Sequence, residues 1–325
     1  MQIGKIILPN RVLLAPMAGI TDKSFRLLAR EQGCGLVHTE MISAQGLLYG
    51  NQRTLDMLPS PEEGRPLAVQ LFGHDPETMA RAAQIVATYP VDIIDINMGC
   101  PVEKVVKSGG GAALLREPRR AAQLVAAVTR AVSLPVTVKI RKGWDEGEVT
   151  AVPLARRLVA AGAQALSVHG RTRRQMYGGR ADWNIIRQVQ EAVPVPVWGN
   201  GDLWKPKDAA RMLAETGCAG VLLARGTLGN PWLISRTIAH LSGRPLPPPP
   251  SPGERVKMAL RHLDLICDHK GEDRGVVEMR KFAAWYLKGL PHSAGVRARV
   301  SRATSRAEMK DVLRGYLANI PPGQV

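Results

Sequence analysis

Residues 93–101 read Ile-Ile-Asp-Ile-Asn-Met-Gly-Cys-Pro, an apolar run that ends in a turn carrying a thiol. The run is typical of a buried strand, and Pro101 stiffens the turn because its ring fixes φ and removes a backbone donor. Gly99 can adopt backbone conformations that are closed to other residues. A cysteine taken at random is more often structural than reactive. We nevertheless interpret this stretch as a strand that delivers Cys100 into a loop for chemistry, because polar residues elsewhere in the chain support that role.

Short apolar runs alternate with amphipathic segments from the N-terminus to about Gly243. Eight such runs favour an α/β fold, a (β/α)8 TIM barrel, over an open doubly wound sheet. No Gly-x-Gly-x-x-Gly follows the first run, which argues against a Rossmann domain. We expect strands at Val12–Ala15, Leu36–Thr39, Leu67–Phe72, Ile93–Ile96, Val136–Ile140, Ala165–His169, Val195–Trp198 and Gly220–Leu223, and helices at Pro76–Thr88, Pro118–Val132, Val149–Ala161 and Pro206–Glu215.

A proline-rich segment divides the chain. Residues 243–252 read Gly-Arg-Pro-Leu-Pro-Pro-Pro-Pro-Ser-Pro, which favours an extended path because consecutive prolines cannot continue a helix. Residues 254–269 and 275–290 have helical periodicity, and the tail to Leu317 is similar, with no strand pattern. We therefore expect a barrel over residues 1–243, a linker over 244–253 and a small all-helical domain over 254–325.

The cysteines and the apolar runs exclude several classes of protein. The four cysteines of the 325-residue chain, Cys34, Cys100, Cys218 and Cys267, are widely scattered and form no Cys-x-x-Cys pair. This spacing argues against a zinc or iron–sulfur site and against a disulfide framework. The sequence shows no signal peptide and no apolar run of membrane length. We expect a soluble, cytoplasmic protein with no bound metal, no membrane partner and no obligate protein partner.

The formal net charge of +16 and the pI of about 10.2 indicate a polyanionic partner, with nucleic acid as the leading candidate. An Arg-rich proteome would also raise the charge, so the position of the basic residues decides. No Asp or Glu lies between residues 280 and 306, whereas an ordinary solvated surface mixes signs. We interpret this stretch as a polyanion-binding surface. Its basic residues are Arg280, Lys281, Lys288, Arg297, Arg299, Arg302 and Arg306.

Polar residues and glycines collect at the ends of the expected strands. In a TIM barrel the carboxyl ends of the strands form the active-site face, and an inert barrel has no reason to keep polar residues there. The residues are Pro16-Met17-Ala18, Glu40, Gln70, Asn97 with Cys100, Lys139 with Arg141, His169, Asn200-Gly201-Asp202 and Ala224-Arg225-Gly226.

The last two of these strand ends resemble an anion site. Their glycines let backbone N–H groups approach oxygen atoms, and Arg225 offers a guanidinium suited to phosphate. Two ordinary Gly turns are the alternative. With Lys139 and Gln70 on inner strands, the set suits flavin mononucleotide (FMN), whose ring would lie across the barrel mouth. Lys139 would then place positive charge near the pyrimidine edge of the ring and stabilise the reduced, anionic flavin.

With these residues assembled, the chain resembles the tRNA-dihydrouridine synthases, most closely the bacterial B-type subfamily. The resemblance runs from Ile7 to about Arg306. It differs at Phe282, where many members carry His, so no imidazole is available at that position. The motifs that carry it are residues 14–22, 97–101, 169–183, 199–202 and 226–232 in the barrel, and 280–281 and 285–289 in the helical domain.

The resemblance implies reduction of the C5=C6 bond of particular uridines in tRNA to dihydrouridine, with FMN as cofactor and NADPH, or NADH, as electron donor. Cys100 would be the catalytic acid that protonates C5 after a hydride reaches C6. An unperturbed thiol has a pKa of about 8.5 and is mostly protonated at neutral pH. The residues implied to hold FMN are Pro16, Met17, Ala18, Gln70, Lys139, His169, Asn200, Gly201, Asp202, Ala224 and Arg225.

The resemblance also implies contacts with tRNA. Asn97 would hydrogen-bond the uracil, and Arg141 would steady charge on the uracil carbonyls. The helical domain would grip the RNA backbone while the target base swings out into the barrel. The expected tRNA contacts are Arg171, Arg173, Arg174, Tyr177 and Arg180 on the loop after the sixth strand, and Arg280, Lys281, Arg297, Arg299 and Arg302 in the helical domain.

Two other functions remain open. A different FMN barrel, such as a dihydroorotate or enoate reductase, shares the phosphate site but does not explain the basic helical domain. A non-enzymatic RNA-binding protein on an inherited barrel would not need Cys100, Lys139, His169 and Arg225.

Overall fold

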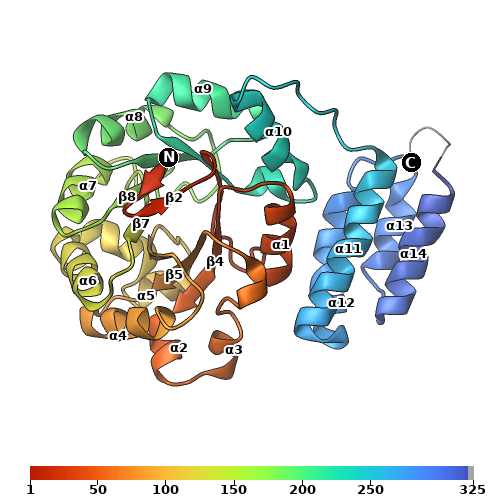
Figure 1. Ribbon diagram of the computed structural model, residues 1–325, viewed down its shortest axis with the longest axis horizontal. Coiled ribbons are helices and arrows are strands. Elements are labelled where there is room, and N and C mark those ends of the chain that lie inside the picture. Colours follow the sequence, from red (N-terminus) through yellow and green to blue (C-terminus); the bar gives the residue numbers. More distant parts are fainter. Residues whose placement is uncertain (321–325) are drawn as a thin grey trace.

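The computed structural model describes residues 1–320 (Figure 1). Eight parallel strands close into a barrel, each hydrogen-bonded to the next along the chain, and the last strand pairs with the first. The predicted TIM barrel is confirmed. Residues 321–325 of the expected helical domain lie outside the described residues. The strands are β3 (Val12–Leu14), β4 (Leu36–Ser43), β5 (Leu67–Phe72), β6 (Ile93–Met98), β7 (Val136–Arg141), β8 (Ala165–His169), β9 (Val197–Asn200) and β10 (Gly220–Leu223).

Helices surround the barrel, and α1 begins where the side chain of Asp22 accepts a hydrogen bond from the N–H of Phe25 at 3.0 Å. A short antiparallel hairpin at the N-terminus, β1 (Gln2–Ile3) with β2 (Ile6–Ile7), was not predicted, because two-residue strands leave no periodic pattern. The helices around the barrel are α1 (Lys23–Glu31), α2 (Ala44–Leu48), α3 (Gln52–Leu55), α4 (Pro76–Val86), α5 (Glu103–Lys107), α6 (Pro118–Ala131), α7 (Ala151–Ala160), α8 (Trp183–Ala192), α9 (Pro206–Thr216) and α10 (Trp232–Leu241), with 3-10 turns η1 (Pro61–Glu63), η2 (Gly111–Arg116) and η3 (Arg225–Thr227).

Several strand ends differ from the sequence-based prediction. Strand β9 begins at Val197 and not at Val195, because Pro196 has no N–H for the strand ladder. Strands β6 and β7 continue through Met98 and Arg141, so polar residues extend the apolar runs. In the register of the barrel Asn97 pairs with Lys139, Arg141 with His169, and His169 with Asn200. The barrel strands themselves therefore hold these polar side chains.

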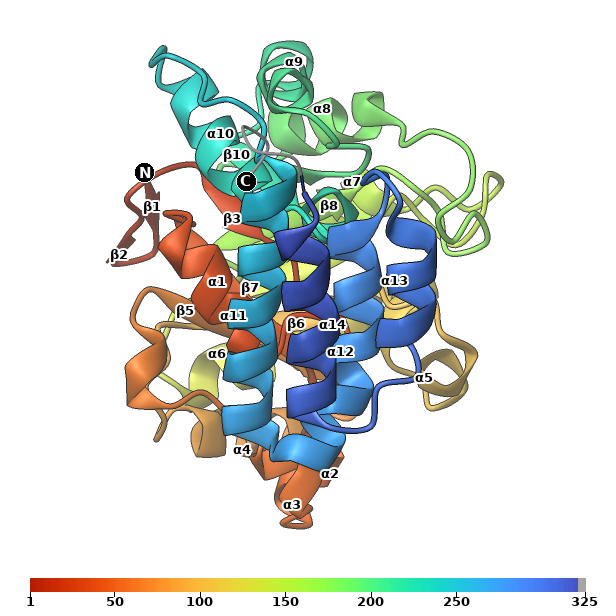
Figure 2. The same ribbon diagram turned by 90° about the vertical axis from the view of Figure 1, so that its right-hand side faces the viewer.

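The C-terminal part is all helical, as predicted, and its helices lie side by side against the barrel (Figure 2). Helix α11 begins at Pro252, two residues before the predicted start. Ser251 and Glu254 form a reciprocal capping box that fixes this start, and proline is well suited to the first helical position. The four helices are α11 (Pro252–Lys270), α12 (Glu272–Leu287), α13 (Ser293–Val300) and α14 (Arg306–Ala318). Among residues 1–320, no helix is both long enough and apolar enough to cross a membrane.

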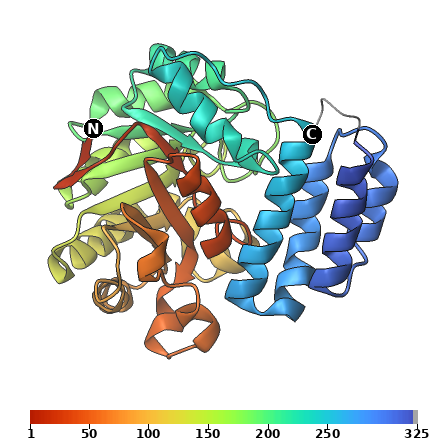
Figure 3. The same cartoon turned by 45° about the vertical axis from the view of Figure 1, so that its right-hand side comes forward.

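The helical part shares its hydrophobic core with the barrel. Helix α1 packs against α11 (Figure 3). At this junction the ring of Phe282 lies 6.1 Å from that of Phe25 and 4.4 Å from that of His262, and all three side chains are fully buried. A buried ion pair joins Asp22 to Lys270 at 2.5 Å. One continuous core of buried residues therefore runs from the barrel strands into α11, α12 and α14.

Candidate active site at the barrel mouth

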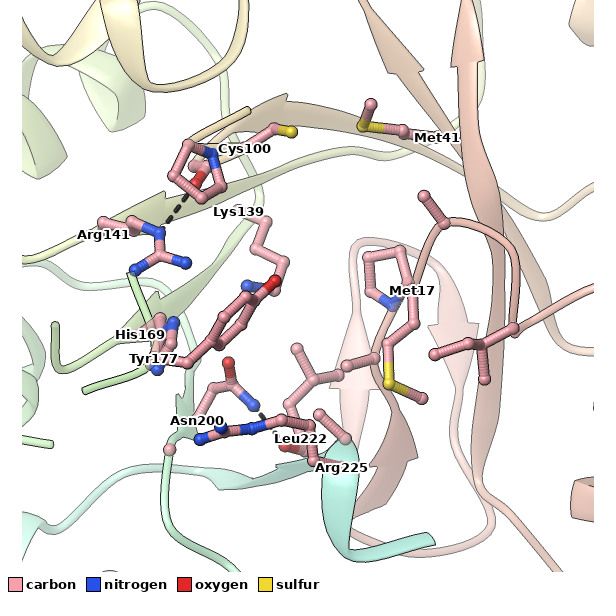
Figure 4. Close-up of a pocket in the computed structure, with 18 of the residues that line it drawn as sticks. Met17, Met41, Cys100, Lys139, Arg141, His169, Tyr177, Asn200, Leu222 and Arg225 are labelled. Carbon is pink, nitrogen blue, oxygen red and sulfur yellow. Dashed lines mark hydrogen bonds between the residues drawn. The ribbon is translucent and has the colours of Figure 1, made fainter. Parts of the chain in front are cut away.

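A cavity of about 420 Å³ opens at the carboxyl ends of the barrel strands (Figure 4). All of the residues that the resemblance implied for FMN line it, together with Cys100, Asn97, Arg141 and Tyr177. Residues that the sequence reasoning missed are mostly apolar and carry no chemical signal of their own. They are Ala15, Ile20, Met41, Val102, Leu203, Trp204, Leu222 and Leu228. Met41 and Trp204 each follow a polar strand-end residue closely, which is the one sequence signal that could have identified them.

The turn that carries Cys100 is held from three sides. The side-chain oxygen of Asn97 accepts hydrogen bonds from the N–H groups of Gly99, at 3.1 Å, and Cys100, at 2.9 Å. Nε of Arg141 donates to the carbonyl of Gly99 at 2.7 Å, and the N–H of Ala112 donates to the carbonyl of Cys100 at 3.0 Å. The thiol lines the cavity and is half-buried, and this burial raises its pKa. The thiol is therefore protonated at neutral pH and able to donate a proton.

The cavity wall next to the Cys100 turn carries an excess of positive charge. Burial, and secondarily the charge of Arg141, lowers the pKa of Lys139 to about 8. Burial also lowers the pKa of Arg141, to about 10, and holds that of His169 well below its usual value, with Lys139 adding to the shift of His169. Within residues 1–320, Lys139 and Arg141 form no ion pair. A neutral His169 beside two unpaired cations makes this wall suited to an anion.

The corner formed by β9 and β10 is shaped to admit a close-lying group. Gly201 has φ of +121°, and a Cβ there would lie 2.7 Å from Cβ of Ala181 and 3.1 Å from the His169 ring, so only glycine fits. The Asn200 side chain donates to the carbonyl of Leu222 at 2.7 Å, which ties the two strand ends together. Arg225, whose side chain is 33% exposed, begins η3 at this corner.

Arg171 does not reach the surface. It is only 1% exposed, and its guanidinium donates to the carbonyls of Gly178, at 2.9 Å, and Gly179, at 2.6 Å. It also donates to both carboxylate oxygens of Asp202, at 2.8 and 2.9 Å. The prediction that Arg171 contacts RNA from an exposed loop is therefore wrong. Arg171 instead ties that loop to the end of β9, and Asp202 lines the cavity with its carboxylate already engaged.

The rest of this loop lies nearer the solvent. Tyr177 is 53% exposed and lines the cavity, as Figure 4 shows. Its ring lies between two guanidinium groups, 4.8 Å from that of Arg225 and 5.6 Å from that of Arg141. Arg173 stacks over Trp144, with its guanidinium 4.8 Å from the ring centre. RNA contacts by Arg173, Arg174, Tyr177 and Arg180 stay predictions.

In the helical part, the predicted basic surface is smaller than the sequence suggested. Arg306 pairs with Asp264 at 2.5 Å and with Asp268 at 2.7 Å, both on α11, so its charge is neutralised within the protein. Arg280 donates to the carbonyl of Ala303 at 2.7 Å. These two residues therefore have structural partners that a count of charges along the chain does not reveal.

The remaining basic residues of that surface are less engaged. Arg299 and Arg302 are exposed, Arg297 is half-buried, and none of the three forms an ion pair within residues 1–320. Nζ of Lys281 donates to the carbonyl of Gly19 at 2.5 Å, on the barrel loop that also carries Met17 and Ala18. Lys281 therefore connects the basic surface to the rim of the cavity, and the role of these residues in binding RNA stays a prediction.

Replacing Lys139 with methionine should stabilise the protein that lacks a bound anion. Burial lowers the pKa of Lys139 from its ordinary value of 10.5 to about 8, so the unfolded chain binds a proton more readily than the folded one. The resulting destabilisation is fully present below pH 8 and is lost as the pH rises from about 8 towards 10.5. Urea unfolding of flavin-free protein at pH 7 and pH 10 should show a stabilisation by Lys139→Met that shrinks at pH 10. An equal effect at both pH values would contradict it.

Residues 13–320 match the family described as dihydrouridine synthase (Dus). The chain is 42% identical over 303 residues to tRNA-dihydrouridine synthase B of Pseudomonas aeruginosa, covering 93% of this chain and 91% of that protein. It is 41% identical over 314 residues to probable tRNA-dihydrouridine synthase 1 of Synechocystis, covering 96% of this chain and 88% of that protein.

A solved structure of morphinone reductase in complex with tetrahydroNAD is also similar. It superposes with a TM-score of 0.52 and 15% identity, over 78% of this chain and 92% of that one. At this identity the likeness concerns the fold alone, and it agrees with the closed barrel described above. The match to the family and the relatives at about 40% identity decide the assignment. The chain belongs to the dihydrouridine synthase family and groups with its bacterial B-type members.

Proposed function

We propose that this protein uses FMN and NADPH, or NADH, to reduce the C5=C6 bond of particular uridines in tRNA to 5,6-dihydrouridine. The observation that carries the proposal is that the protonated thiol of Cys100 and the cations Lys139 and Arg141 line one cavity. A proton donor and positive charge in a single site are what the reduction of a conjugated carbonyl requires. The proposed substrate implies a cytoplasmic location.

The donor set of the cavity fits FMN. Arg225 and the backbone of η3 would hold its phosphate, and Gly201 leaves room for close approach of the cofactor. Lys139 would lie against the ring system. Burial makes the positive charge of Lys139 costly, and an anionic group beside it would offset that cost. The other residues that would hold it are Pro16, Met17, Ala18, Gln70, His169, Asn200, Asp202 and Ala224. When bound and reduced, FMN supplies the hydride that reaches C6.

Cys100 would complete the reduction. As negative charge develops at C5 of the uracil, the Sγ–H bond breaks, the proton moves to C5, and a thiolate remains that regains a proton from solvent. Arg141 would stabilise the charge that spreads to the uracil carbonyls. Asn97 has its oxygen engaged by two backbone N–H groups, so its proposed contact with uracil would use an Nδ2 hydrogen. That hydrogen now faces Met41, whose Sδ lies 3.7 Å from Nδ2.

The basic surface of the helical part would bind the tRNA. A uridine inside folded tRNA cannot reach a cavity at a barrel mouth, so the base must swing out of its stack. Lys281 joins the helical surface to the cavity rim, which supports one continuous path for the RNA from that surface to the thiol. Arg297, Arg299 and Arg302 would contact the phosphates along this path.

Replacing Arg297, Arg299 and Arg302 together with alanine should weaken tRNA binding and its salt dependence. Each lost phosphate contact should flatten the slope of log affinity against log salt by about 0.7 to 0.9. Binding titrations across a salt series measure this slope, and flavin content should not change. The matched control removes three exposed arginines from α7 and α8, Arg156, Arg157 and Arg187. Equal loss of slope in both triple variants would show that only net charge matters.

The proposed function is tested on purified protein. The sample should be yellow, should oxidise NADPH faster when unmodified tRNA is added, and should leave dihydrouridine at defined tRNA positions. NADPH oxidation driven by a small enone or by orotate, with no response to tRNA, would favour a small-molecule reductase instead. Binding of tRNA by a protein that takes up no flavin would favour a non-enzymatic RNA-binding role.

A further inference from the structure

A chain of buried hydrogen bonds leads from the interior of the barrel to the turn of Cys100. Oγ1 of Thr137 donates to one carboxylate oxygen of Asp95 at 2.6 Å, and Nε2 of Gln70 donates to the other at 2.6 Å. Oε1 of Gln70 accepts from Nδ2 of Asn97 at 2.8 Å. Oδ1 of Asn97 in turn accepts from the N–H groups of Gly99 and Cys100. Asp95, Gln70 and Asn97 are each at most 7% exposed, so water does not substitute for these bonds.

The chain has only one consistent direction. A carboxylate can only accept hydrogen bonds, and backbone N–H groups can only donate them. Between these two ends stand two amides, and each must turn its NH₂ group towards Asp95 and its oxygen towards Cys100. If Gln70 were reversed, Asn97 would have to reverse too, and its NH₂ group would then face the N–H groups of Gly99 and Cys100. Two donors facing each other in a buried site would displace the turn.

The geometry points to Asp95 as a positioning residue for the catalytic acid: its carboxylate orients Gln70 and Asn97 so that they hold the turn of Cys100 in place. This inference rests on the proposed role of Cys100 as the proton donor. It gives Asp95 a task that neither the cavity lining nor the family motif assigns, since Asp95 lies beneath the cavity and does not line it. Asp95 does not line the cavity, and its hydrogen bonds reach the turn of Cys100 only through the two amides.

Three variants separate the hydrogen bonds from the charge of Asp95. Asp95→Asn removes the charge but keeps an oxygen that can accept from Gln70, while its new NH₂ group can donate to the hydroxyl of Thr137. Asp95→Leu removes both the charge and the acceptor. Thr137→Val removes the other partner of Asp95 and leaves the path to Cys100 intact. If Asp95 positions the turn by hydrogen bonds, Asp95→Leu should be the one variant of the three in which the turn is displaced and uridine reduction is strongly slowed.

The first measurement is amide hydrogen exchange, which needs no substrate. In Asp95→Leu the amides of Gly99 and Cys100 should exchange roughly tenfold faster or more, because Gln70 and Asn97 are no longer held in the orientation in which Asn97 accepts from both amides. Exchange elsewhere in the barrel should be unchanged, which a general loss of folding would not produce. Asp95→Asn and Thr137→Val should protect both amides as the unsubstituted protein does. If Asp95→Leu does not fold, Asp95→Ala removes the same acceptor without adding bulk.

The second measurement is uridine reduction in a single turnover of pre-reduced enzyme. Misplacing the thiol should slow this step roughly tenfold or more in Asp95→Leu, whereas Asp95→Asn should lose less than about threefold. A loss in Asp95→Asn as large as in Asp95→Leu would overturn the inference in favour of a charge effect, as would normal protection of both amides in Asp95→Leu. If the unsubstituted protein makes no dihydrouridine, the proposed function fails, and the exchange comparison still decides whether Asp95 holds the turn.

Discussion

Replacing Cys100 with alanine is expected to leave FMN bound and its reduction by NADPH intact, while dihydrouridine formation falls by roughly 10²-fold or more, the scale for loss of a positioned general acid. The thiol lines the cavity without a role in holding the charged wall, so its loss should not release the cofactor. Absorbance of the bound flavin, stopped-flow reduction by NADPH and single-turnover yield of dihydrouridine separate the three steps.

Cys267→Ala is the matched control for this substitution. Cys267 is a buried thiol on α11 and lies outside the cavity, so uridine reduction should not change. Near-normal dihydrouridine yield from Cys100→Ala would rule out Cys100 as the proton donor. In that case Cys100 would be only a half-buried part of the cavity wall.

Phe25→Ala should lower the free energy of unfolding by about 3–5 kcal/mol, a large share of the stability of a typical protein. Phe25 is fully buried between the barrel and the helical part, against Phe282 and His262. Its removal would leave a cavity in the core that both parts share. Urea unfolding followed by far-UV circular dichroism and by flavin release should show the loss in both signals together.

Val277→Ala serves as the comparison, because Val277 is 55% exposed on α12 and its loss should change stability by no more than about 0.5 kcal/mol. The shared core also predicts that a chain ending near Ser251 would expose Phe25 and the ion-paired Asp22, and would not fold as a stable barrel. Equal stability of Phe25→Ala and Val277→Ala would show that the barrel and the helical part do not depend on each other.

The barrel was predictable because each of its eight strands contains a short, buried apolar run that stands out in the sequence. The polar residues of the cavity were predictable for a related reason. Parallel strands bring their carboxyl ends to one face, so residues far apart in sequence, such as Gln70 and Arg225, could be expected to lie together.

What could not be predicted depends on partners distant in sequence. The burial of Arg171 is decided by the carboxylate of Asp202 and by carbonyls of its own loop, and the neutralisation of Arg306 by acids on α11. A count of charged residues in the sequence treats Arg171 and Arg306 as free positive charges. The path from Asp95 to Cys100 was invisible for the same reason, because Gln70 and Asn97 meet only once β5 and β6 lie side by side.

The shared core at Phe25, His262 and Phe282 has a consequence for how one uridine would be chosen among many. Every uridine presents the same ring, so a cavity that accepts one accepts all. Under the proposed function, selection would then come from a distance, the separation between the surface that would bind the tRNA and the thiol that would receive the base. Because the barrel and the helical part share one packed core, this separation would be the same in every molecule. Retargeting the protein to another nucleotide would mean repacking that junction, with the chemistry of the cavity left as it is.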